Sequence, residues 1–279
     1  MNTQKYAVIG HPISHSLSPF IHELLFGLDH IDASYVALDI CDLESEYDEK
    51  LSVLSGYNVT IPYKIDIIKK LSKISEKAFL CNSVNTVKNG EIAEGFTTDG
   101  YGFSQAVKAK TGGVLPKDVL IYGYGGAARA IAFECLEHGC NISFSVRESS
   151  IDNCNKLKDE IFEKLSVTVN VYSLYDIPKD KNFSLLVNAT PVGMHPNIDA
   201  CVASDEIIQN AEAVFDAVYN PLETLLLKKA KEYEKIAIGS VEMLVYQAAK
   251  AHEIWVDGKY TDAQLLSICE KVKDKLQNR

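Results

Sequence analysis

The sequence has no excess of basic residues and no long run of apolar ones. Its 28 Lys and Arg are outnumbered by 38 Asp and Glu, which gives a formal net charge of −10. Nucleic acids and anionic membrane surfaces are bound mainly by excess Lys and Arg, so neither is expected as a partner. The most apolar stretch, 119–136, is interrupted by Arg129 and Glu134, whereas a membrane span needs roughly 20 consecutive apolar residues. A small anionic ligand needs only local donors and is compatible with this composition.

The cysteines form no pattern that is typical of disulfides or metal sites. There are 7, an odd number, and no Cys-x-x-Cys pair or Cys/His spacing of the zinc-binding kind occurs. The N-terminal residues contain no apolar segment followed by a small-residue cleavage site, as a secretory signal would. We therefore expect free thiols in a reducing cytoplasm and no bound metal.

Length and residue pattern predict two α/β domains. With 279 residues the chain has room for two domains of ordinary size. Short β-rich runs alternate with helical ones, a pattern typical of βαβ units and parallel sheets. Strands are expected at 6–10, 34–38, 56–61, near 83–95, 118–123, 142–146, 167–172, 183–189, 213–219 and 235–238. Helices are expected at 19–28, 41–54, 62–74, from about 99, and at 126–138, 152–164, 222–234, 241–255 and 261–276; the turn-rich segment 111–118 indicates a boundary.

A glycine turn follows the strand at 118–123. In the segment IYGYGGAARA, Gly123, Gly125 and Ala128 occupy the G-x-G-x-x-G/A positions between an apolar strand and a helix. Gly123 permits a tight turn, Gly125 lets the backbone approach a pyrophosphate, and Ala128 lets helix and strand pack closely. The helix N-terminus then offers N–H groups to the anion. The pattern predicts nucleotide binding, and a glycine-rich turn without a ligand is the alternative.

Two adjacent residues after the next strand point to different cofactors. Glu148 lies about 20 residues beyond the glycine turn, where a carboxylate accepts hydrogen bonds from the ribose 2′-hydroxyl of NAD. Arg147 beside it carries the planar donor group that suits the 2′-phosphate of NADP. A third reading is that Glu148 merely caps the following helix.

Three polar clusters precede residue 100. In the first, Ser14–Pro19, we expect Ser18 to cap a helix whose apolar face contains Phe20, Ile21, Leu24, Leu25 and Leu28. Ser16 is then left over, and paired hydroxyls at a helix N-terminus suit a carboxylate. The second cluster, Asn58–Lys64, places a lysine just beyond a strand end, where α/β sheets bind ligands. The third joins 82–86 to 95–100 and contributes Asn85 and Asp99; a solvated lysine and a capping aspartate are the alternatives.

Taken together, these segments resemble the shikimate dehydrogenase family, within the wider shikimate/quinate dehydrogenases. The matching pieces lie in order along nearly the whole chain: YAVIGHPISHSLSPFIH, NVTIPYK, SVNTV, TTDGYGF, GYGGAARA, NATPVGM, DAVYNPLETLLL and MLVYQAAKAHEIW. The resemblance implies an oxidoreductase that interconverts 3-dehydroshikimate and shikimate with NADPH or NADP, in chorismate and aromatic amino acid biosynthesis. The NVT-x-P-x-K form favours the shikimate branch.

The resemblance also implies a role for individual residues. Lys64 and Asp99 would be the catalytic pair, because hydride delivery to a ketone leaves an alkoxide that a positioned ammonium can protonate. Ser16 and Ser18 would bind the substrate carboxylate. The other implied substrate-binding residues are Thr60, Asn85, Tyr219 and Gln247. The implied cofactor-binding residues are Gly123, Tyr124, Gly125, Gly126, Ala127, Arg147, Glu148, Asn188, Thr190 and Gly239.

The implied fold is α/β with two domains. Residues 1–100 would form a substrate domain with a mostly parallel sheet, completed by C-terminal helices at 240–279. Residues 101–239 would form a doubly wound Rossmann domain for NADP. The implied partner is the small-molecule substrate, and a monomer and a homodimer are both compatible with the sequence.

The sequence departs from the family pattern at several positions. Thr97 replaces an Asn, Ser240 stands where a Gly commonly meets the nicotinamide, and Glu148 replaces a Thr near the 2′-phosphate. Ile151 replaces one of the two arginines that hold that phosphate. NADP is therefore expected to be preferred by a reduced margin, with NAD as the alternative. Two other functions are open: a quinate/shikimate dehydrogenase that uses NAD, and a catalytically silent nucleotide- or metabolite-binding relative.

Overall fold

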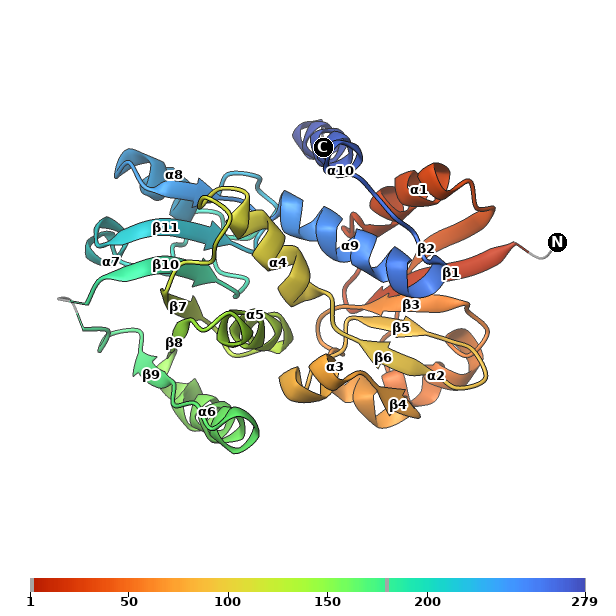
Figure 1. Ribbon diagram of the computed structural model, residues 1–279, viewed down its shortest axis with the longest axis horizontal. Coiled ribbons are helices and arrows are strands. Elements are labelled where there is room, and N and C mark those ends of the chain that lie inside the picture. The colour runs from red at the N-terminus through yellow and green to blue at the C-terminus, as the bar shows by residue number, and fades with distance from the viewer. Residues whose placement is uncertain (1–2, 179–180, 279) are drawn as a thin grey trace. The chain divides into compact units, whose positions relative to one another are not determined.

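A computed structural model describes residues 3–178 and 181–278, which fold into two compact α/β units. The first unit contains the chain up to Gly102 together with Leu244–Lys275. The second contains Phe103–Met243 and the residues from Leu276 onward. The chain passes from the first unit to the second within α4 (Asp99–Lys108) and returns within α9 (Val241–Val256). Each unit contains one sheet, so the expected two-domain α/β class is confirmed (Figure 1).

The first unit is built on a six-stranded mixed sheet with the order β2-β1-β3-β5-β6-β4. β1 is parallel to both β2 and β3, and β4 is parallel to β6, whereas β5 is antiparallel to β3 and β6. The strands are β1 (Gln4–Gly10), β2 (Ala33–Asp39), β3 (Gly56–Val59), β4 (Lys73–Ile74), β5 (Thr86–Lys88) and β6 (Glu94–Phe96). The helices are α1 (Ser18–Asp29), α2 (Leu43–Lys50), η1 (Asp66–Lys70), α3 (Glu76–Cys81) and α10 (Asp262–Gln277), in addition to α9.

Both faces of this first sheet are covered by helices. Tyr6 of β1 packs with Phe26 of α1 and Trp255 of α9, whereas Ala7 and Ile9 belong to the core on the other face, beside α2. Successive side chains of a strand point to opposite faces, so β1 is buried on both sides and its sequence is a continuous apolar run. In Figure 1, α1 and α9 lie along one side of these strands and α2 lies along the other.

The second unit contains a fully parallel six-stranded sheet with the order β12-β11-β10-β7-β8-β9. Counted from β7, this is the strand order of the doubly wound dinucleotide-binding fold, whose ligands bind where the order reverses. Here the reversal lies between β7 and β10. The strands are β7 (Asp118–Tyr122), β8 (Asn141–Val146), β9 (Asn170–Ser173), β10 (Phe183–Asn188), β11 (Ala211–Asp216) and β12 (Ile236–Ile238). The helices are α5 (Gly126–Glu137), η2 (Glu148–Ser150), α6 (Ile151–Leu165), α7 (Asp205–Gln209) and α8 (Leu225–Glu232), after most of α4.

The expected helix at 62–74 is wrong. That segment contains only the short 3₁₀ helix η1 and then β4, which pairs with Glu94 and Gly95 of β6. A helical pattern in the sequence is overridden here by a strand pairing that forms only in the folded sheet. Two short helices were not expected, and each begins at a serine cap: α3 after Ser75 and α7 after Ser204.

Helix α1 begins one residue earlier than expected, and its buried face coincides only in part with the expected one. Ser18 is its first residue, and Leu17 holds the cap position without a side-chain hydrogen bond. Its buried residues include His22 and Phe26, whereas Leu28 is 38% exposed. Ile21 and Leu25 are buried as expected, but the core under this helix is also partly aromatic and polar, and the prediction missed His22 and Phe26.

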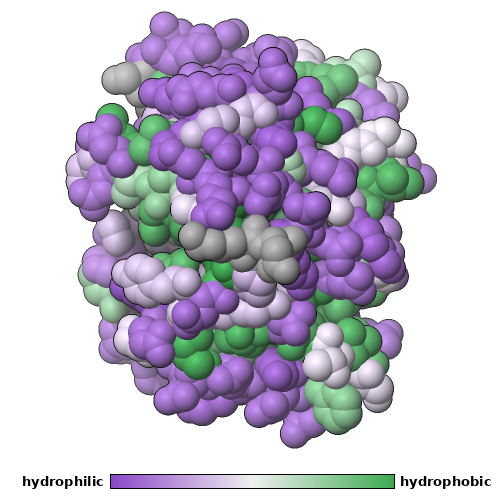
Figure 2. Space-filling view, turned by 90° about the vertical axis from the view of Figure 1, so that its left-hand side faces the viewer, coloured by the Kyte–Doolittle hydropathy of each residue, from purple (hydrophilic) through white to green (hydrophobic). Residues whose placement is uncertain are grey.

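The part of the surface drawn in Figure 2 is mainly hydrophilic. On the face drawn in Figure 2, hydrophilic residues predominate and hydrophobic ones occur in separate groups. Within the described residues, no helix has the length and apolar character that crossing a membrane would need.

Candidate active site

The first unit brings Lys64 and Asp99 into direct contact. Lys64 lies beyond the end of β3, and its Nζ donates to Oδ2 of Asp99 over 2.6 Å. Asp99 is the first residue of α4, and the side chains of the pair are only 14% and 7% exposed. Two opposite unit charges that lie 4 Å apart attract each other by about 4 kcal/mol at an effective dielectric constant of 20. Lys64 and Asp99 lie closer than that, so their attraction amounts to several kcal/mol. The carboxylate therefore fixes the position and direction of the Lys64 side chain.

Asn85 holds the second oxygen of this carboxylate. Its Nδ2 lies 2.8 Å from Asp99 Oδ1 and 3.2 Å from Gln247 Oε1, and its Oδ1 accepts the backbone N–H of Thr98 over 2.7 Å. The backbone bond fixes which end of the amide faces Asp99. Lys64, Asp99, Asn85 and Gln247 thus form one connected polar group, although Gln247 follows Asn85 by 162 residues.

Ser16 and Ser18 lie at the start of α1. Ser16 Oγ accepts the backbone N–H of Ser18 over 3.2 Å, so Ser16, and not Ser18, supplies the local cap-like contact. The Ser18 hydroxyl is a hydrogen-bond neighbour of Tyr35 in β2. Burial raises the pKa of Tyr35 well above its ordinary value, and the hydrogen bond with Ser18 opposes that rise.

Tyr35 and Asn58 connect the serines to the Lys64–Asp99 pair. The Tyr35 hydroxyl donates to Asn58 Oδ1 over 2.7 Å, and Asn58 Nδ2 donates to the backbone carbonyl of Asn85 over 3.1 Å. The sequence did not predict a role for Tyr35, because the sequence around a tyrosine in a strand does not indicate which residue its hydroxyl will bond. Thr60 follows the end of β3, where its backbone N–H donates to Ile9.

The second unit has a sharp turn at its strand-order reversal. Gly123 follows β7 with φ +104°, a conformation that side chains rarely adopt. A Cβ at this position would lie 3.0 Å from Thr190 Cγ2 and 3.2 Å from the carbonyl oxygen of Ala189. Thr190 and Ala189 follow β10, so the residues expected to hold the cofactor from two different strands do meet here.

The N-terminus of α5 is shaped for an anion. Gly125 is its cap residue and brings no side chain, and a Cβ built there would meet nothing within 4 Å. The first helical turn, from Gly126 and Ala127 onward, contains no acidic residue, whereas Ala128 is fully buried against the sheet. Helix N–H groups beside open space fit a pyrophosphate. Tyr124, between the two glycines of the turn, is partly exposed.

Arg147 and Glu148 lie at the end of β8, beside β7, and both are exposed. Glu148 begins η2, and the cap residues of η2 and α6 make no side-chain cap hydrogen bond. The capping reading of Glu148 is therefore wrong. Within residues 3–178 and 181–278, neither side chain forms an ion pair, so both are available to a ligand at this strand end.

The loop after β10 is held by Asn188. Its Oδ1 accepts from the backbone N–H and the hydroxyl of Thr190 over 3.0 and 2.7 Å, and its Nδ2 donates to Asp216 over 2.9 Å. Burial raises the pKa of Asp216 to about 6, against hydrogen bonds from Thr224, the Val218 backbone and Asn188. Asn188 therefore holds the start of this loop in place and links it to the end of β11.

The remaining expected residues follow strand ends of the same sheet. Tyr219 follows β11 and Gly239 follows β12, and both are partly exposed. Ser240, next to Gly239, is 2% exposed, and its hydroxyl has no hydrogen-bond partner within the described chain. The carboxyl ends of parallel strands meet at one edge of a sheet, which is where such folds bind dinucleotides.

Comparison with known proteins decides the family. Residues 8–87 match the model of the shikimate dehydrogenase substrate binding domain. The chain is 39% identical over 262 residues to a shikimate dehydrogenase (NADP(+)) of Methanocaldococcus jannaschii, with 91% of each chain covered. The chain belongs to the shikimate dehydrogenase family.

Solved members of the shikimate dehydrogenase family have the same fold. One, described as a complex with NADP+, is 37% identical and superposes with a TM-score of 0.87 over 97% of this chain and 96% of that one. A second, from Listeria monocytogenes and described as a complex with shikimate and NAD, is 31% identical with a TM-score of 0.84 and covers 97% of this chain and 96% of its own. The resemblance on which the expected fold rested is thereby confirmed.

Proposed function

We propose that this protein is an NADP-dependent shikimate dehydrogenase. It would catalyse the reversible reduction of 3-dehydroshikimate to shikimate in chorismate and aromatic amino acid biosynthesis. The observation that carries this proposal is the Lys64–Asp99 ion pair, which Asn85 holds in place. It occurs in a chain that belongs to the shikimate dehydrogenase family. The pair supplies the proton donor that reduction of a ketone needs.

Lys64 acts as the general acid. When bound, NADPH supplies the hydride. Lys64 Nζ donates its proton to the oxygen that gains negative charge at the ketone carbon, and in the reverse direction it takes the proton back from the hydroxyl. Asp99 keeps Nζ aimed and stabilises the ammonium, and Asn85 keeps Asp99 from turning. A positioned acid of this kind contributes roughly 10²–10⁴-fold to the rate.

The substrate is held by hydroxyl and amide groups. Ser16 and Ser18 bind its carboxylate. The hydrogen bonds of Tyr35 and Asn58 keep Ser18 at a fixed position relative to the catalytic pair. The ring hydroxyls are bound by four residues: Thr60, Asn85, Tyr219 and Gln247. Residues 1–100 with 240–279 form the substrate domain in this proposal, and 101–239 form the NADP domain.

The cofactor is held by the strand ends of the second unit. The turn at Gly123 and the N-terminus of α5 receive the pyrophosphate: the helix offers backbone N–H groups beside open space at Gly125, and Gly123 lets the chain turn sharply into the helix. Arg147 binds the 2′-phosphate of NADP, and Glu148 beside it lowers the margin over NAD. The further contacts are Tyr124, Gly125, Gly126 and Ala127 at the turn, and Asn188, Thr190 and Gly239 at the nicotinamide end.

Glu148 also supports a second candidate function, a quinate/shikimate dehydrogenase that uses NAD. A carboxylate at the end of β8 suits a ribose 2′-hydroxyl, and the Listeria relative is described with NAD. A silent metabolite-binding relative is disfavoured, because the catalytic pair is present and connected.

We also propose a cytoplasmic enzyme. All seven cysteines are free, as expected in a reducing compartment. The acidic composition suits a protein whose partner is a small molecule, with neither nucleic acid nor membrane bound. It would act as a monomer or a homodimer.

Initial rates decide between the candidates. Oxidation of shikimate and of quinate is measured with NADP and with NAD, which gives four values of kcat/KM. The proposal expects the highest value for shikimate with NADP. Turnover of quinate with NAD at a comparable kcat/KM would support the second candidate, and no turnover in any arm would support a silent relative.

A further inference from the structure

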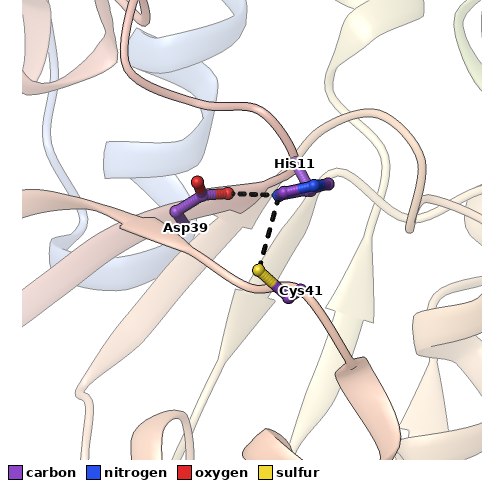
Figure 3. Close-up of side chains that lie close together, drawn as sticks. All are labelled: His11, Asp39 and Cys41. Carbon is purple, nitrogen blue, oxygen red and sulfur yellow. Dashed lines mark hydrogen bonds and ion pairs between the residues drawn. The ribbon is translucent and has the colours of Figure 1, made fainter.

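Three potential metal ligands meet at the carboxyl end of β1 and β2 in the first unit (Figure 3). His11 Nδ1 lies 2.7 Å from Asp39 Oδ1 and 3.7 Å from Cys41 Sγ. All three donor atoms lie within 4.8 Å of one another, and all three residues are exposed. Within residues 3–178 and 181–278, no other group of three such ligands comes together.

The backbone fixes the positions from which the three side chains extend. Gly10 and Asp39 are paired in the parallel ladder of β1 and β2, and the N–H of Ile40 donates to the carbonyl of Gly10 over 3.2 Å. The N–H of His11 donates to Ile61 over 3.1 Å. The three ligands are therefore attached to ordered strand ends and not to a free loop, which reduces the ordering cost of binding an ion.

Glu46 holds the backbone of Cys41 in place but is not itself a metal ligand. Its Oε1 accepts the backbone N–H of Cys41 over 2.9 Å and that of Asp42 over 3.0 Å, and its Oε2 pairs with Lys50. Both carboxylate oxygens of Glu46 are thus engaged. The fourth ligand of a tetrahedral ion at this place would be a water molecule.

The way in which Asp39 and Cys41 both contact His11 Nδ1 is better explained by a bound cation than by hydrogen bonds among the three side chains. Asp39 and Cys41 both face the same nitrogen of His11, as Figure 3 shows, and one imidazole nitrogen carries a single hydrogen or a single lone pair. Two acceptors that converge on one nitrogen leave one contact unsatisfied. A divalent ion placed among the three atoms would satisfy all of them and would balance the charges of a carboxylate and a thiolate.

The separations fit a small transition-metal ion. Zinc–nitrogen bonds of about 2.0–2.1 Å and zinc–sulfur bonds of about 2.3 Å imply an N···S separation of roughly 3.5 Å in a tetrahedral site. The observed 3.7 Å is close to this value. The N···O separation would have to open from 2.7 Å to roughly 3.3 Å. The Asp39 side chain is 51% exposed and has room to make that movement.

We propose that His11, Asp39 and Cys41 form a zinc-type metal site with one coordination position open to water. A mixed N, O and S donor set suits Zn²⁺ or Co²⁺ and does not suit Mg²⁺ or Ca²⁺, which take oxygen ligands. No metal was expected from the sequence, because the ligands follow two different strands and His11 and Asp39 are 28 residues apart. The site is separate from the reduction proposed above, which needs no metal.

Titration of the full chain with Co²⁺ tests the site. The expected result is one equivalent bound in the micromolar range, with a thiolate-to-cobalt band in the near ultraviolet and visible bands typical of four-coordinate cobalt. Zn²⁺ should displace the Co²⁺ and abolish these bands. Because thiol coordination displaces a proton, binding should tighten as pH rises.

Variants identify the ligands. Cys41→Ser should abolish the ultraviolet band, and His11→Gln and Asp39→Asn should each weaken binding at least tenfold. Cys201→Ser, at another partly exposed thiol, is the matched control and should bind as the wild type does. Zn²⁺ should also slow alkylation of Cys41, read by peptide mapping, which needs no variant. Binding no tighter than millimolar, an unchanged Cys41→Ser variant, or unprotected alkylation of Cys41 would each overturn the proposal.

Discussion

His22 and His252 share a hydrogen bond inside the first unit: Nε2 of His252 lies 2.9 Å from Nδ1 of His22, and the two rings are stacked. His252 Nδ1 is bonded in turn to Asp29 over 3.0 Å. Burial lowers the pKa of His22 well below its ordinary value, and the neighbouring His252 lowers it further. Burial also lowers the pKa of His252, although Asp29 opposes this. His22 is therefore held neutral in the folded protein, and protonation of His252 is disfavoured as well.

This pair predicts a loss of stability in mild acid. Below about pH 6.5 an unfolded histidine binds a proton that folded His22 does not, so the free energy of unfolding falls by about 1.4 kcal/mol per pH unit for each such group. The stability is fully present above that pH. Urea unfolding of the wild type between pH 7.5 and 5 should show this dependence of the unfolding free energy on pH. Its slope measures the number of protons taken up on unfolding, and His22→Gln should reduce that number by about one.

His30→Gln is the matched control for this prediction. His30 is exposed at the end of the same helix. The slope of stability against pH is compared, because the absolute stabilities of the two variants will differ for local reasons. A His22→Gln slope equal to that of the wild type would show that His22 is not held neutral.

Lys64→Ala should lower the rate of the chemical step by roughly 10²–10⁴-fold, with a smaller effect on substrate affinity. Asp99→Asn should also impair turnover, and the double variant should lose less than the sum of the two, because the residues act as a unit. Single-turnover kinetics separate the chemical step from binding. Lys69→Ala, at a largely exposed lysine, is the control. Retention of most turnover in Lys64→Ala would rule out the acid role.

Ser16→Ala and Ser18→Ala should each weaken shikimate binding by about 0.5–1.5 kcal/mol, or more because the acceptor is charged. Ser14→Ala, in the same exposed turn, should have little effect. Esterifying the substrate carboxylate should make the wild type bind about as weakly as the two variants do. Binding constants come from calorimetry. An ester that binds as tightly as the acid would assign these hydroxyls another role.

Glu148→Thr should raise the ratio of kcat/KM for NADP to that for NAD about fivefold or more, which corresponds to about 1 kcal/mol. In the proposed site Glu148 would repel the 2′-phosphate, but at an exposed strand end the penalty would be of the size of a surface charge pair, about 1 kcal/mol or less. Arg147→Ala should move the ratio toward NAD. Glu163→Thr, at the other end of α6, controls for the change in net charge. A wild type that prefers NAD outright would reverse the cofactor assignment.

The sequence predicts best what is encoded by neighbouring residues. The glycine turn, the βα alternation and the motifs that contain Lys64 and Asp99 are contiguous, and the structure places all of them as expected apart from the helix at 62–74. The Tyr35–Asn58 connection and the His11 cluster join residues from different strands, and no local pattern indicates which strand ends will be neighbours. The burial of His22 was missed for a related reason: its partner, His252, lies 230 residues away.

The division of the first unit between the two ends of the chain has a consequence for synthesis on the ribosome. Asn85 emerges 162 residues before Gln247, its hydrogen-bond partner in α9. At about 5–20 residues per second, the nascent first unit waits roughly 8–30 s for that helix. Until then the surfaces of Tyr6 and Phe26 that pack on Trp255 stay uncovered. A chain that stops between α4 and α9 keeps Lys64 and Asp99 but lacks the helix that covers Tyr6 and Phe26, so we expect such incomplete products of translation to be inactive and to be recognised by chaperones and proteases.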